Sequence, residues 1–308
     1  MKIAIIGAGG VGGYFGAKLA QAGNDVTFLA RGKHLKAIEE NGLIVKSIQG
    51  DFKVENVQAT DNIQSITPPA LVIVAVKAWQ IKELRDKLKE IIIPETMILP
   101  LQNGVLAAEE LSEVLGKELV LGGLCRILSK IEGPGVIRHF GIAPAIIFGE
   151  FGKSSSERTT ALLNVFSKAG IDAELSTDIE AELWKKFIAI CAGALLAVTK
   201  TTYGECRDLP ETRKMMTDLL TEIYVLSKAK GVQIETDFVN KAVAFIDKFP
   251  ADSTSSLTRD IWDGKPSEIE YQNGTVVKLA EKYGVETPIN RFVYHSILPM
   301  EIKARKAK

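Results

Sequence analysis

The stretch Lys2–Gly13, "KIAIIGAGGVGG", decides the fold class of this chain. It begins with a short apolar run, Lys2–Ile6, which is typical of a buried strand. The pattern GxGxxG follows at Gly7–Gly12, and the residues after it have the apolar spacing of a helix that we expect at Val11–Ala22. A strand, a glycine-rich turn and a helix in this order predict the first unit of a dinucleotide-binding domain.

The glycines of this turn have separate roles in such a site. Gly7 permits the tight turn, Gly9 lets a pyrophosphate approach the backbone, and Gly12 allows close packing of helix and strand. The pyrophosphate would meet the N–H groups at the positive end of the helix. The alternative is a tight turn that binds nothing, but a second strand at the expected distance favours a cofactor site. The predicted contacts are Gly7, Ala8, Gly9, Gly10, Val11 and Gly12.

The end of the second predicted strand, Asp25–Ala30, bears on the choice between NAD(H) and NADP(H). An acidic residue there would bind the 2′-hydroxyl of the adenine ribose and repel a 2′-phosphate. The segment is instead "FLARGKH", with Ala30 at or next to the position of the acid, followed by Arg31 and Lys33. A guanidinium can pair with a phosphate through two parallel hydrogen bonds. We therefore expect NADP(H), with Arg31 at the 2′-phosphate; the alternative is a solvated basic turn.

Short apolar runs alternate with helical patterns through the first half of the chain. Leu71–Val76 and Thr96–Leu101 have the continuous apolar character of buried strands, and a helix is expected between them at Trp79–Ile92. This alternation predicts a parallel sheet covered by helices on both faces. Strand segments broken by "EGPG" and "GIAP" at 119–150 predict an extension of this sheet, with an antiparallel arrangement as one option.

The second half of the chain changes to helical periodicity. The polar run Gly152–Arg158 is expected to open a helix, and Ile171–Leu175 is the last predicted strand. Helices are predicted beyond it at Ile179–Thr199, Pro210–Lys230, Thr236–Phe249, Ser267–Tyr283 and Pro288–Ala307. We predict an α/β Rossmann-type dinucleotide-binding domain at 1–175, followed by an all-α helical domain at 176–308.

The overall composition argues against several classes of function. The chain has 308 residues, enough for two domains, with 38 basic and 38 acidic residues and a formal net charge of zero. A dedicated nucleic-acid or membrane-surface binder would carry a basic excess, so we expect neither nucleic acid nor membrane as a partner. The longest uncharged apolar run, Phe187–Val198, is shorter than the ~20 residues that span a bilayer.

Cysteine and histidine patterns do not indicate a disulfide framework or a metal site. The three cysteines form no CxxC pair, and the three histidines show no metal-ligand spacing. We expect no metal and a cytoplasmic protein, since a reducing compartment is the default for unpaired cysteines. The sequence leaves open whether the chain forms a homodimer.

Polar side chains follow two of the predicted strands. Lys77 comes directly after Leu71–Val76, and Asn103 lies just beyond Thr96–Leu101. Ligands of doubly wound sheets bind outside the carboxyl ends of the strands, where a lysine can meet phosphate or ribose and an amide can hold nicotinamide or a substrate oxygen. The alternatives are a helix-capping lysine and an Asn-Gly turn.

The segment "LWKKFIAICAGALLAV" carries two adjacent lysines, Lys185 and Lys186, in an otherwise apolar helix. Neighbours in a helix point about 100° apart, so the two lysines face different surroundings. Lys186 shares its face with Ile190 and Gly193, a small and apolar neighbourhood suited to the wall of a cleft. It also follows Glu182 by one turn, and such ion pairs are common on solvated helix faces. Periodicity alone separates the two lysines poorly.

Five segments occur in a fixed order along the chain: "IAIIGAGGVGGYFGAKLAQAGNDVTFLARG", "VKAWQ", "LQNGV", "LWKKF" and "SSLTRDIWDGKPSEIEYQNG". Together they resemble the ketopantoate reductase (2-dehydropantoate 2-reductase) family over essentially the whole length. The last segment is the most specific, because six residues fall at the family's spacing: Ser256, Asp260, Gly264, Glu268, Asn273 and Gly274. The resemblance implies a Rossmann domain, an all-helical domain and an NADPH site in the cleft between them.

The resemblance also implies roles for individual residues. Lys186 matches the general acid of the family, and Glu268 matches the acidic residue on the cofactor side that helps to position that lysine. Ser256 matches the serine that holds the substrate carboxylate. Asn103 and Lys77 match positions of the cofactor cleft, where Asn103 is also expected to meet the substrate. The alternatives are a helix-start carboxylate for Glu268 and a loop or capping serine for Ser256.

The chain departs from the family at positions that line the substrate pocket in family members. Family members carry asparagines one and two turns after the catalytic lysine, and those positions are Ile190 and Ala194 here. A third asparagine is absent near Tyr203 and Gly204, and Ser253 stands where an asparagine is common. A pocket that loses hydrogen-bonding groups becomes less selective for a hydroxylated substrate. The residues of the reaction are kept, whereas those that read the substrate have changed.

We therefore expect an NADPH-dependent reductase that converts the 2-oxo acid ketopantoate to pantoate, with Lys186 as the proton donor and Lys185 as a surface charge. A negative charge develops on the ketone oxygen during reduction, and a nearby ammonium can stabilise it and then donate a proton. One alternative is a D-2-hydroxyacid dehydrogenase that acts on more apolar 2-oxo acids. The other is a non-catalytic NADP(H)-binding sensor.

Overall fold

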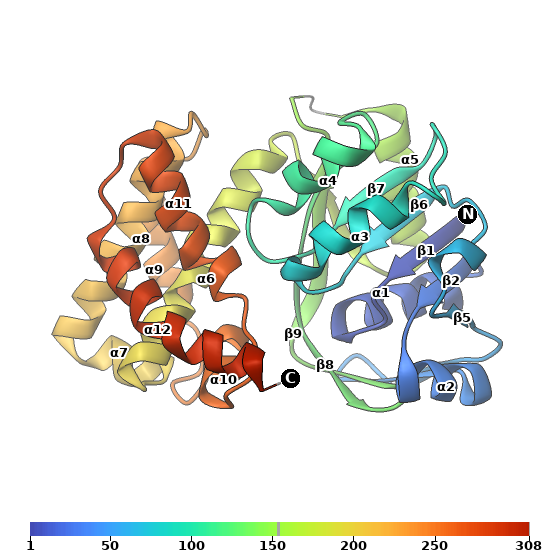
Figure 1. Ribbon diagram of the computed structural model, residues 1–308, viewed down its shortest axis with the longest axis horizontal. Coiled ribbons are helices and arrows are strands. Elements are labelled where there is room, and N and C mark those ends of the chain that lie inside the picture. Colours follow the sequence, from blue (N-terminus) through green and yellow to red (C-terminus); the bar gives the residue numbers. More distant parts are fainter. Residues whose placement is uncertain (153–154, 308) are drawn as a thin grey trace. The chain divides into compact units, whose positions relative to one another are not determined.

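The computed structural model describes residues 1–152 and 155–307, and Figure 1 shows the course of the chain. The chain divides into two compact units. The α/β unit contains Met1–Gln102 and Leu106–Ile179, and the helical unit contains Asn103–Val105 and Glu180–Lys308. Part of the polar run predicted to precede a helix, Lys153 and Ser154, lies outside the described residues.

A parallel sheet of five strands forms the centre of the α/β unit, with the strand order β5-β2-β1-β6-β7. Its strands are β1 (Lys2–Ile6), β2 (Asp25–Leu29), β5 (Gln58–Thr60), β6 (Leu71–Val74) and β7 (Met97–Pro100). All neighbours pair in parallel. The sheet confirms the predicted Rossmann-type fold. Short apolar runs in the sequence predicted the buried strands of this sheet. Strand β5 was not predicted, because it is short and polar.

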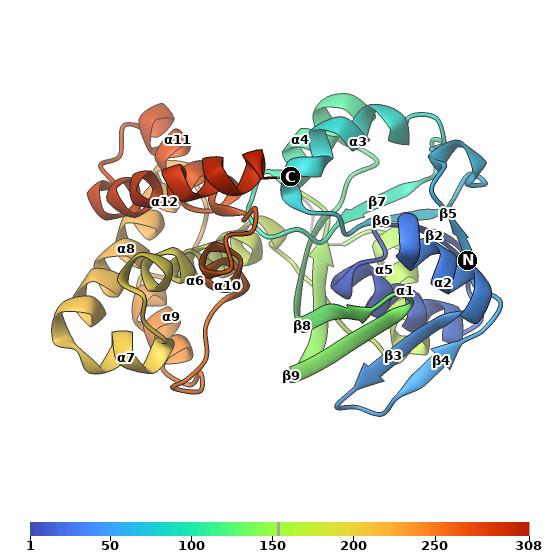
Figure 2. The same ribbon diagram turned by 60° about the horizontal axis from the view of Figure 1, so that its bottom comes forward.

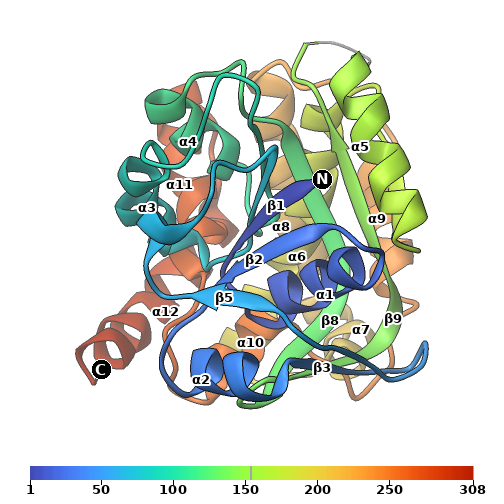
Figure 3. The same cartoon turned by 90° about the vertical axis from the view of Figure 1, so that its right-hand side faces the viewer.

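The two faces of this sheet are covered by different layers, because successive side chains of a strand point to opposite sides. Ile3 and Ile5 pack with α1 (Gly10–Gln21), whereas Ala4 and Ile6 pack with α3 (Ile81–Leu88) and α4 (Ala107–Leu115). Figure 3 shows α1 and the pair α3–α4 on opposite sides of the strands. Burial of each isoleucine contributes about 1.5–3 kcal/mol, so this alternation fixes the register.

Most of the region at 119–150 forms a second sheet, which corrects the prediction that it extends the first one, although Val120 joins β7 of the first sheet through an isolated parallel bridge to Ile98. The second sheet has the order β10-β9-β3-β4, and β8 pairs antiparallel with β9. Its strands are β3 (Leu43–Ser47), β4 (Phe52–Val54), β8 (Gly122–Gly133), β9 (Val136–Gly149) and β10 (Asp172–Leu175). Figure 2 shows α1 between the two sheets. Strand β9 belongs to the second sheet because it pairs with β3. The few residues of β3 gave no clear strand pattern in the sequence.

Two further helices belong to the α/β unit: α2 (Gly32–Asn41) follows β2, and α5 (Glu157–Lys168) follows the polar run. The helical unit contains the rest: α6 (Ile179–Thr199), α7 (Tyr203–Asp208), α8 (Pro210–Ala229), α9 (Phe238–Ile246), α10 (Ser256–Trp262), α11 (Asn273–Tyr283) and α12 (Pro288–Lys306). This arrangement confirms an all-α second part. Among the described residues, no helix is both long and apolar enough to cross a membrane.

The helix predicted at Ser267–Tyr283 is interrupted, which corrects that prediction. A 3-10 turn occupies Ile269–Tyr271, and Gln272 has φ −107° and ψ −105°, outside the helical region. The α-helix α11 therefore begins only at Asn273. Sequence periodicity could not reveal this break, because the residues before it are held by hydrogen bonds to a distant helix.

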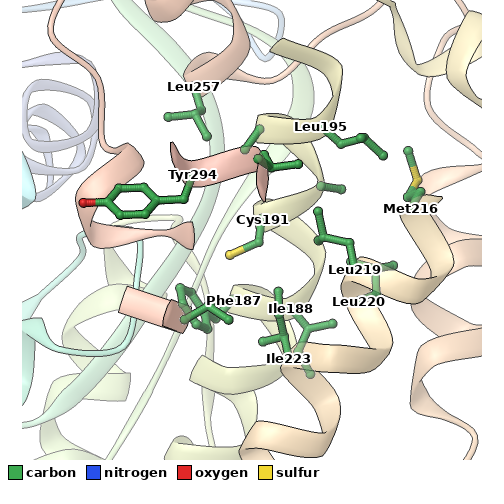
Figure 4. Close-up of a cluster of buried hydrophobic side chains, with 14 of the residues drawn as sticks. Phe187, Ile188, Cys191, Leu195, Met216, Leu219, Leu220, Ile223, Leu257 and Tyr294 are labelled. Atoms are coloured by element: carbon green, nitrogen blue, oxygen red, sulfur yellow. The ribbon is translucent and has the colours of Figure 1, made fainter. Parts of the chain in front are cut away.

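The core of the helical unit is built around α6. Its buried face meets α8, and Figure 4 shows these side chains in contact: Phe187, Ile188, Cys191 and Leu195 from α6, and Met216, Leu219, Leu220 and Ile223 from α8. Leu257 from α10 and Tyr294 from α12 belong to the same cluster. Lys185 and Lys186 occupy half-buried positions on this otherwise largely buried helix.

Candidate functional site

The glycine turn between β1 and α1 has the geometry that its sequence predicts. Gly7 has φ +103°, a region that favours glycine, and a Cβ on it would lie 2.9 Å from Val76 Cγ1. A Cβ on Gly12 would lie 2.9 Å from Ile5 Cγ2, so helix and strand could not pack as closely. A Cβ on Gly9, in contrast, would meet no atom within 4 Å. The backbone at Gly9 is therefore open to a ligand.

Backbone N–H groups point outward from the start of α1. Gly7 and Ala8 both direct their N–H groups to Leu29 O at 3.3 Å. The first intrahelical hydrogen bond runs from Gly13 N to Gly9 O at 2.7 Å. The N–H groups of Gly10, Val11 and Gly12 precede that bond, and such groups at a helix N-terminus attract anions. The turn fits the pyrophosphate of a dinucleotide.

Arg31 lies at the N-terminus of α2, directly after β2. It is exposed and takes the N-cap position with extended backbone, φ −140° and ψ 154°. Ala30 before it is buried, and its N–H donates to Thr60 O at 2.9 Å. The backbone of Arg31 is thus held beyond the carboxyl end of β2, at the positive end of a ten-residue helix. These groups fit a phosphate on the adenine ribose.

His34, to which the sequence gave no function, bonds to the glycine turn. Gly135 N donates to His34 Nδ1 at 3.0 Å, so the ring proton lies on Nε2, which is 2.8 Å from Ala8 O and donates to it. Burial lowers the pKa of His34, and the hydrogen bond to Ala8 offsets only part of this effect. The neutral imidazole therefore joins the turn to the β8–β9 hairpin. Neither partner is close in sequence, so no local pattern could reveal the link.

Lys77 is exposed at the start of the 3-10 turn Ala78–Gln80, which follows β6. Its N–H donates to Gln80 Oε1 at 3.1 Å, and its Nζ lies 5.7 Å from the centre of the Trp79 ring. Its backbone thus caps the turn, as the alternative interpretation expected, while the side chain stays at the carboxyl end of the sheet. Capping and ligand binding are compatible at this position.

Asn103 and Glu268 meet within the helical unit. Asn103 Nδ2 donates to Glu268 Oε2 at 3.1 Å, and Glu268 is only 6% exposed. The next residue, Gly104, has φ +99°, and a Cβ on it would lie 2.8 Å from Tyr271 O. The Asn-Gly turn therefore packs tightly against the loop that carries Glu268. Two predicted site residues are held together by this close approach.

Lys185 and Lys186 of α6 have different surroundings. Lys185 Nζ pairs with Glu182 at 3.0 Å and with Glu235 at 3.3 Å. Burial alone would lower the pKa of Lys185, but these two carboxylates together raise it, so this amine is a poor proton donor. The carboxylate Glu182, expected beside Lys186, thus forms an ion pair with Lys185. Lys186 is half-buried.

The start of α10 docks on the side of α6 that carries Lys186. Thr258 Oγ1 donates to Gly193 O at 2.8 Å, and a Cβ on Gly193 would lie 2.8 Å from Ser255 Cβ. Gly193 is two turns from Lys186 on the same helix face. Ser256 is exposed at the first position of α10, and Ser255 provides the N-cap by accepting from Thr258 N. The capping role therefore belongs to Ser255, which leaves the Ser256 hydroxyl at a helix start.

The positions that depart from the family pattern also cluster in the helical unit. Ala194 is fully buried, and Ile190 is half-buried one turn earlier. Tyr203 N donates to Ser253 O at 3.0 Å, so two changed positions lie side by side. Burial raises the pKa of Tyr203 to about 12. Ser253 Oγ donates to Pro250 O, a local bond that ties up its hydroxyl proton.

The predicted site residues thus form two groups. The glycine turn, Arg31 and Lys77 belong to the α/β unit, whereas Asn103, Lys186, Ser256 and Glu268 belong to the helical unit. Within the described residues, no group of three or more His, Cys, Asp or Glu side chains could hold a metal ion.

Comparison with known proteins assigns the chain to a family. The model for "Ketopantoate reductase PanE/ApbA" matches residues 3–153, and the model for the C-terminal part of the same family matches residues 178–301. An oxidoreductase of Bacillus subtilis, YkpB, which is uncharacterized, is 31% identical over 96% of this chain and 98% of its own. A 2-dehydropantoate 2-reductase from Nostoc sp. is 32% identical over 96% of this chain and 94% of its own.

Solved structures give the same assignment. A PanE/ApbA family ketopantoate reductase from Ralstonia eutropha superposes with a TM-score of 0.91 and 31% identity, covering 99% of this chain and 100% of that one. D-mandelate dehydrogenase bound to NADH and anilino(oxo)acetate shares the fold, with a TM-score of 0.88, 22% identity and coverage of 99% of each chain. The chain belongs to the ketopantoate reductase family of dinucleotide-binding oxidoreductases.

Proposed function

We propose that this chain reduces a 2-oxo acid with NADPH, and that its substrate is 2-dehydropantoate, which it converts to pantoate. The hydrogen bond between Asn103 and Glu268 carries the proposal, because it joins residues from distant segments at the end of β7. Curated relatives at about one-third identity are named for this reaction, for example the one from Nostoc sp. at 32%. The three cysteines are free and buried, which suits the reducing cytoplasm that we propose as the location.

The preference for NADPH rests on the end of β2. No carboxylate stands there to repel a 2′-phosphate, and the exposed Arg31 is the N-cap residue at the positive end of α2. When bound, NADPH supplies the hydride. The chain supplies an open backbone at Gly9 and the N–H groups of the first turn of α1 for the pyrophosphate.

Lys186 is the proton donor in this proposal. Reduction of a ketone leaves negative charge on its oxygen, and the Nζ ammonium of Lys186 stabilises this charge and donates a proton to it. The neighbouring Lys185 is engaged by Glu182 and Glu235, which supports Lys186 rather than Lys185 for the role. Ser256, exposed at the start of α10, holds the substrate carboxylate with its hydroxyl.

A second candidate is a D-2-hydroxyacid dehydrogenase that acts on apolar 2-oxo acids. Ala194 and Ile190 support it, because they replace hydrogen-bonding side chains on α6 with apolar ones. A polar site rejects a substrate that lacks the matching group, whereas an apolar wall discriminates much less. The two candidates share the cofactor, the proton donor and the carboxylate site, and they differ only in the side chain of the oxo acid.

Absorbance at 340 nm distinguishes these functions. Ketopantoate and 2-oxoisocaproate would each be tested with NADPH and with NADH. A higher kcat/KM for ketopantoate with NADPH supports the proposed function, and a higher value for 2-oxoisocaproate supports the dehydrogenase. Tight NADPH binding without turnover of either acid would contradict both and favour a sensor.

A further inference from the structure

Glu301 is a buried carboxylate of α12 that the proposed reaction does not use. It is 3% exposed, and its two oxygens accept the N–H of Ser267 at 3.2 and 2.9 Å. The hydroxyl of Ser267 donates to Glu301 Oε2 at 2.6 Å. Ser267 directly precedes Glu268, so Glu301 holds the residue next to a proposed site carboxylate.

Arg305, one turn further along α12, completes this grip. Its Nε pairs with Glu301 Oε1 at 2.7 Å, and its Nη2 donates to Ser267 O at 3.2 Å. The N–H, hydroxyl and carbonyl of Ser267 are thus all bonded to α12. Tyr294, also on α12, donates its hydroxyl to Glu270 Oε1 at 3.1 Å. The same helix therefore fixes the loop on both sides of Glu268.

This grip explains the interrupted helix at 269–272. A helix that began at Ser267 would use the Ser267 carbonyl as the acceptor for Tyr271 N, but here Arg305 binds that carbonyl and Tyr271 N donates to Glu268 O at 3.0 Å. The loop then turns so that Glu268 Oε2 accepts from Asn103 Nδ2. The Glu301 carboxylate is buried whereas Arg305 is exposed, so the carboxylate loses its hydration and depends on these hydrogen bonds. The orientation of Glu268 gives this pair a further purpose.

We propose that Glu301 is a positioning residue, which clamps Ser267 and thereby aims the Glu268 carboxylate at Asn103 in the dinucleotide site. The inference rests on the proposed role of Glu268 in cofactor binding. Glu301 touches neither cofactor nor substrate in this proposal and acts through Glu268 alone. Its effect on cofactor binding must therefore vanish when Glu268 has already been neutralised.

A double-mutant cycle tests this dependence. The dissociation constant of NADPH would be measured by its fluorescence for wild type, Glu301→Gln, Glu268→Gln and the double variant. Residues linked in one hydrogen-bond network show coupling of about 1 kcal/mol, so Glu301→Gln should weaken binding about fivefold in the wild type and less than about twofold beside Glu268→Gln. Equal weakening in both backgrounds would overturn the proposal. Ser267→Ala, which keeps the backbone N–H, replaces Glu301→Gln if that variant does not fold.

Glu222 provides a matched control. It also binds α12 from a distant helix, accepting the N–H groups of Ile289 and Asn290 at 2.9 and 3.0 Å, but at the opposite end from the Glu268 loop. Glu222→Gln should lower the melting temperature as Glu301→Gln does. Its effect on NADPH binding should remain small and independent of Glu268→Gln. Coupling of Glu222 to Glu268 as strong as that of Glu301 would contradict a specific clamp.

Hydrogen exchange separates this inference from the proposed function. If Glu268→Gln alone leaves NADPH binding unchanged, the role of Glu268 in cofactor binding is wrong. The clamp is then judged by amide exchange at 267–272, which Glu301→Gln should accelerate at least about tenfold and Glu222→Gln should not. Unchanged exchange at 267–272 in Glu301→Gln would overturn the clamp itself.

Discussion

Asn103 Nδ2 lies 3.1 Å from Glu268 Oε2, although 165 residues separate the two in sequence. The amide that follows β7 is thereby tied to the loop before α11. Hydrogen bonds to a charged group are stronger than those between neutral groups, so each side chain restricts the orientation of the other. This hydrogen bond joins the sequence motifs "LQNG" and "PSEIE", which lie far apart along the chain.

Removal of the amide should therefore destabilise the helical unit. Asn103→Ala is expected to lower the free energy of unfolding by about 1–2 kcal/mol, because a largely buried carboxylate loses a donor. Asn103→Asp should be worse, since it places a second carboxylate beside Glu268. Urea denaturation of the three proteins measures both effects. An Asn103→Asp variant as stable as Asn103→Ala would show that the two side chains do not interact in solution.

Loss of Lys186 should abolish most of the activity. General acid catalysis contributes about 100- to 10,000-fold, so Lys186→Ala should lower kcat by a factor in this range while NADPH still binds. Lys185→Ala is the matched control, because its ion pairs lie near the surface and should change kcat less than about twofold. Steady-state rates at 340 nm give both values. Comparable rates for Lys186→Ala and wild type would remove Lys186 from the mechanism.

Arg31 should discriminate between the two cofactors. A charge-assisted hydrogen bond is worth about 1.5–3 kcal/mol, so Arg31→Ala should weaken NADPH about 10- to 100-fold and NADH hardly at all. Lys33→Ala, at the neighbouring exposed lysine, is the control and should have a smaller effect. Fluorescence titration of both cofactors supplies the comparison. An equal loss for NADPH and NADH would exclude the 2′-phosphate role.

His34 should make the protein less stable in acid. Its folded pKa lies below the ordinary value of 6.5, so the unfolded chain takes up a proton first as the pH falls. The contribution is therefore complete above about pH 6.5 and is lost as the pH drops from there towards the folded pKa. His34→Gln keeps a donor for Ala8 O without titrating, so the stability gap between wild type and variant should shrink in acid. Urea denaturation at pH 7.5 and pH 5 measures it, and a constant gap would contradict the assignment.

Substitution of Ile190 tests which residues determine substrate specificity. Ile190→Asn restores an amide one turn after Lys186, on an exposed enough position to avoid an unpaired buried group. The variant should shift the ratio of kcat/KM for ketopantoate over 2-oxoisocaproate upwards by about tenfold. Ala194→Asn is less suitable, because Ala194 is fully buried. A ratio that stays unchanged would place the specificity elsewhere in the helical unit.

Local sequence patterns predicted the central sheet and most helices, since their apolar spacing is strong and self-contained. The glycine turn was predicted because Gly7 and Gly12 stand where a Cβ would clash, and the helix predicted at Val11–Ala22 begins one residue earlier, at Gly10. Strand β3 was missed and the predicted strands at 119–150 were assigned to the wrong sheet, because β3 and β9 pair across about ninety residues: Ser47 pairs with His139. A short window of sequence contains no information about a pairing partner so far along the chain.

Some residues of the candidate site were also found from the sequence, whereas others became apparent only in the structure. Motifs and family resemblance supplied Lys186, Ser256 and Glu268, whose roles are still to be measured. His34 and Glu301 carry no motif, and their importance depends on atoms supplied by Gly135 and Ser267. The break before Asn273 was invisible for the same reason, since the bonds that replace the helix come from α12.

The grouping of Asn103–Val105 with the helical unit has a consequence for dissecting the molecule. The helical unit is not one continuous piece of chain, because three of its residues are encoded seventy-five positions ahead of the rest. A fragment starting at residue 180 would therefore leave Glu268 without its amide donor and Tyr271 without the glycine that packs on its carbonyl. A single cut in the gene cannot yield both halves intact, and any split version must carry this tripeptide with the C-terminal part.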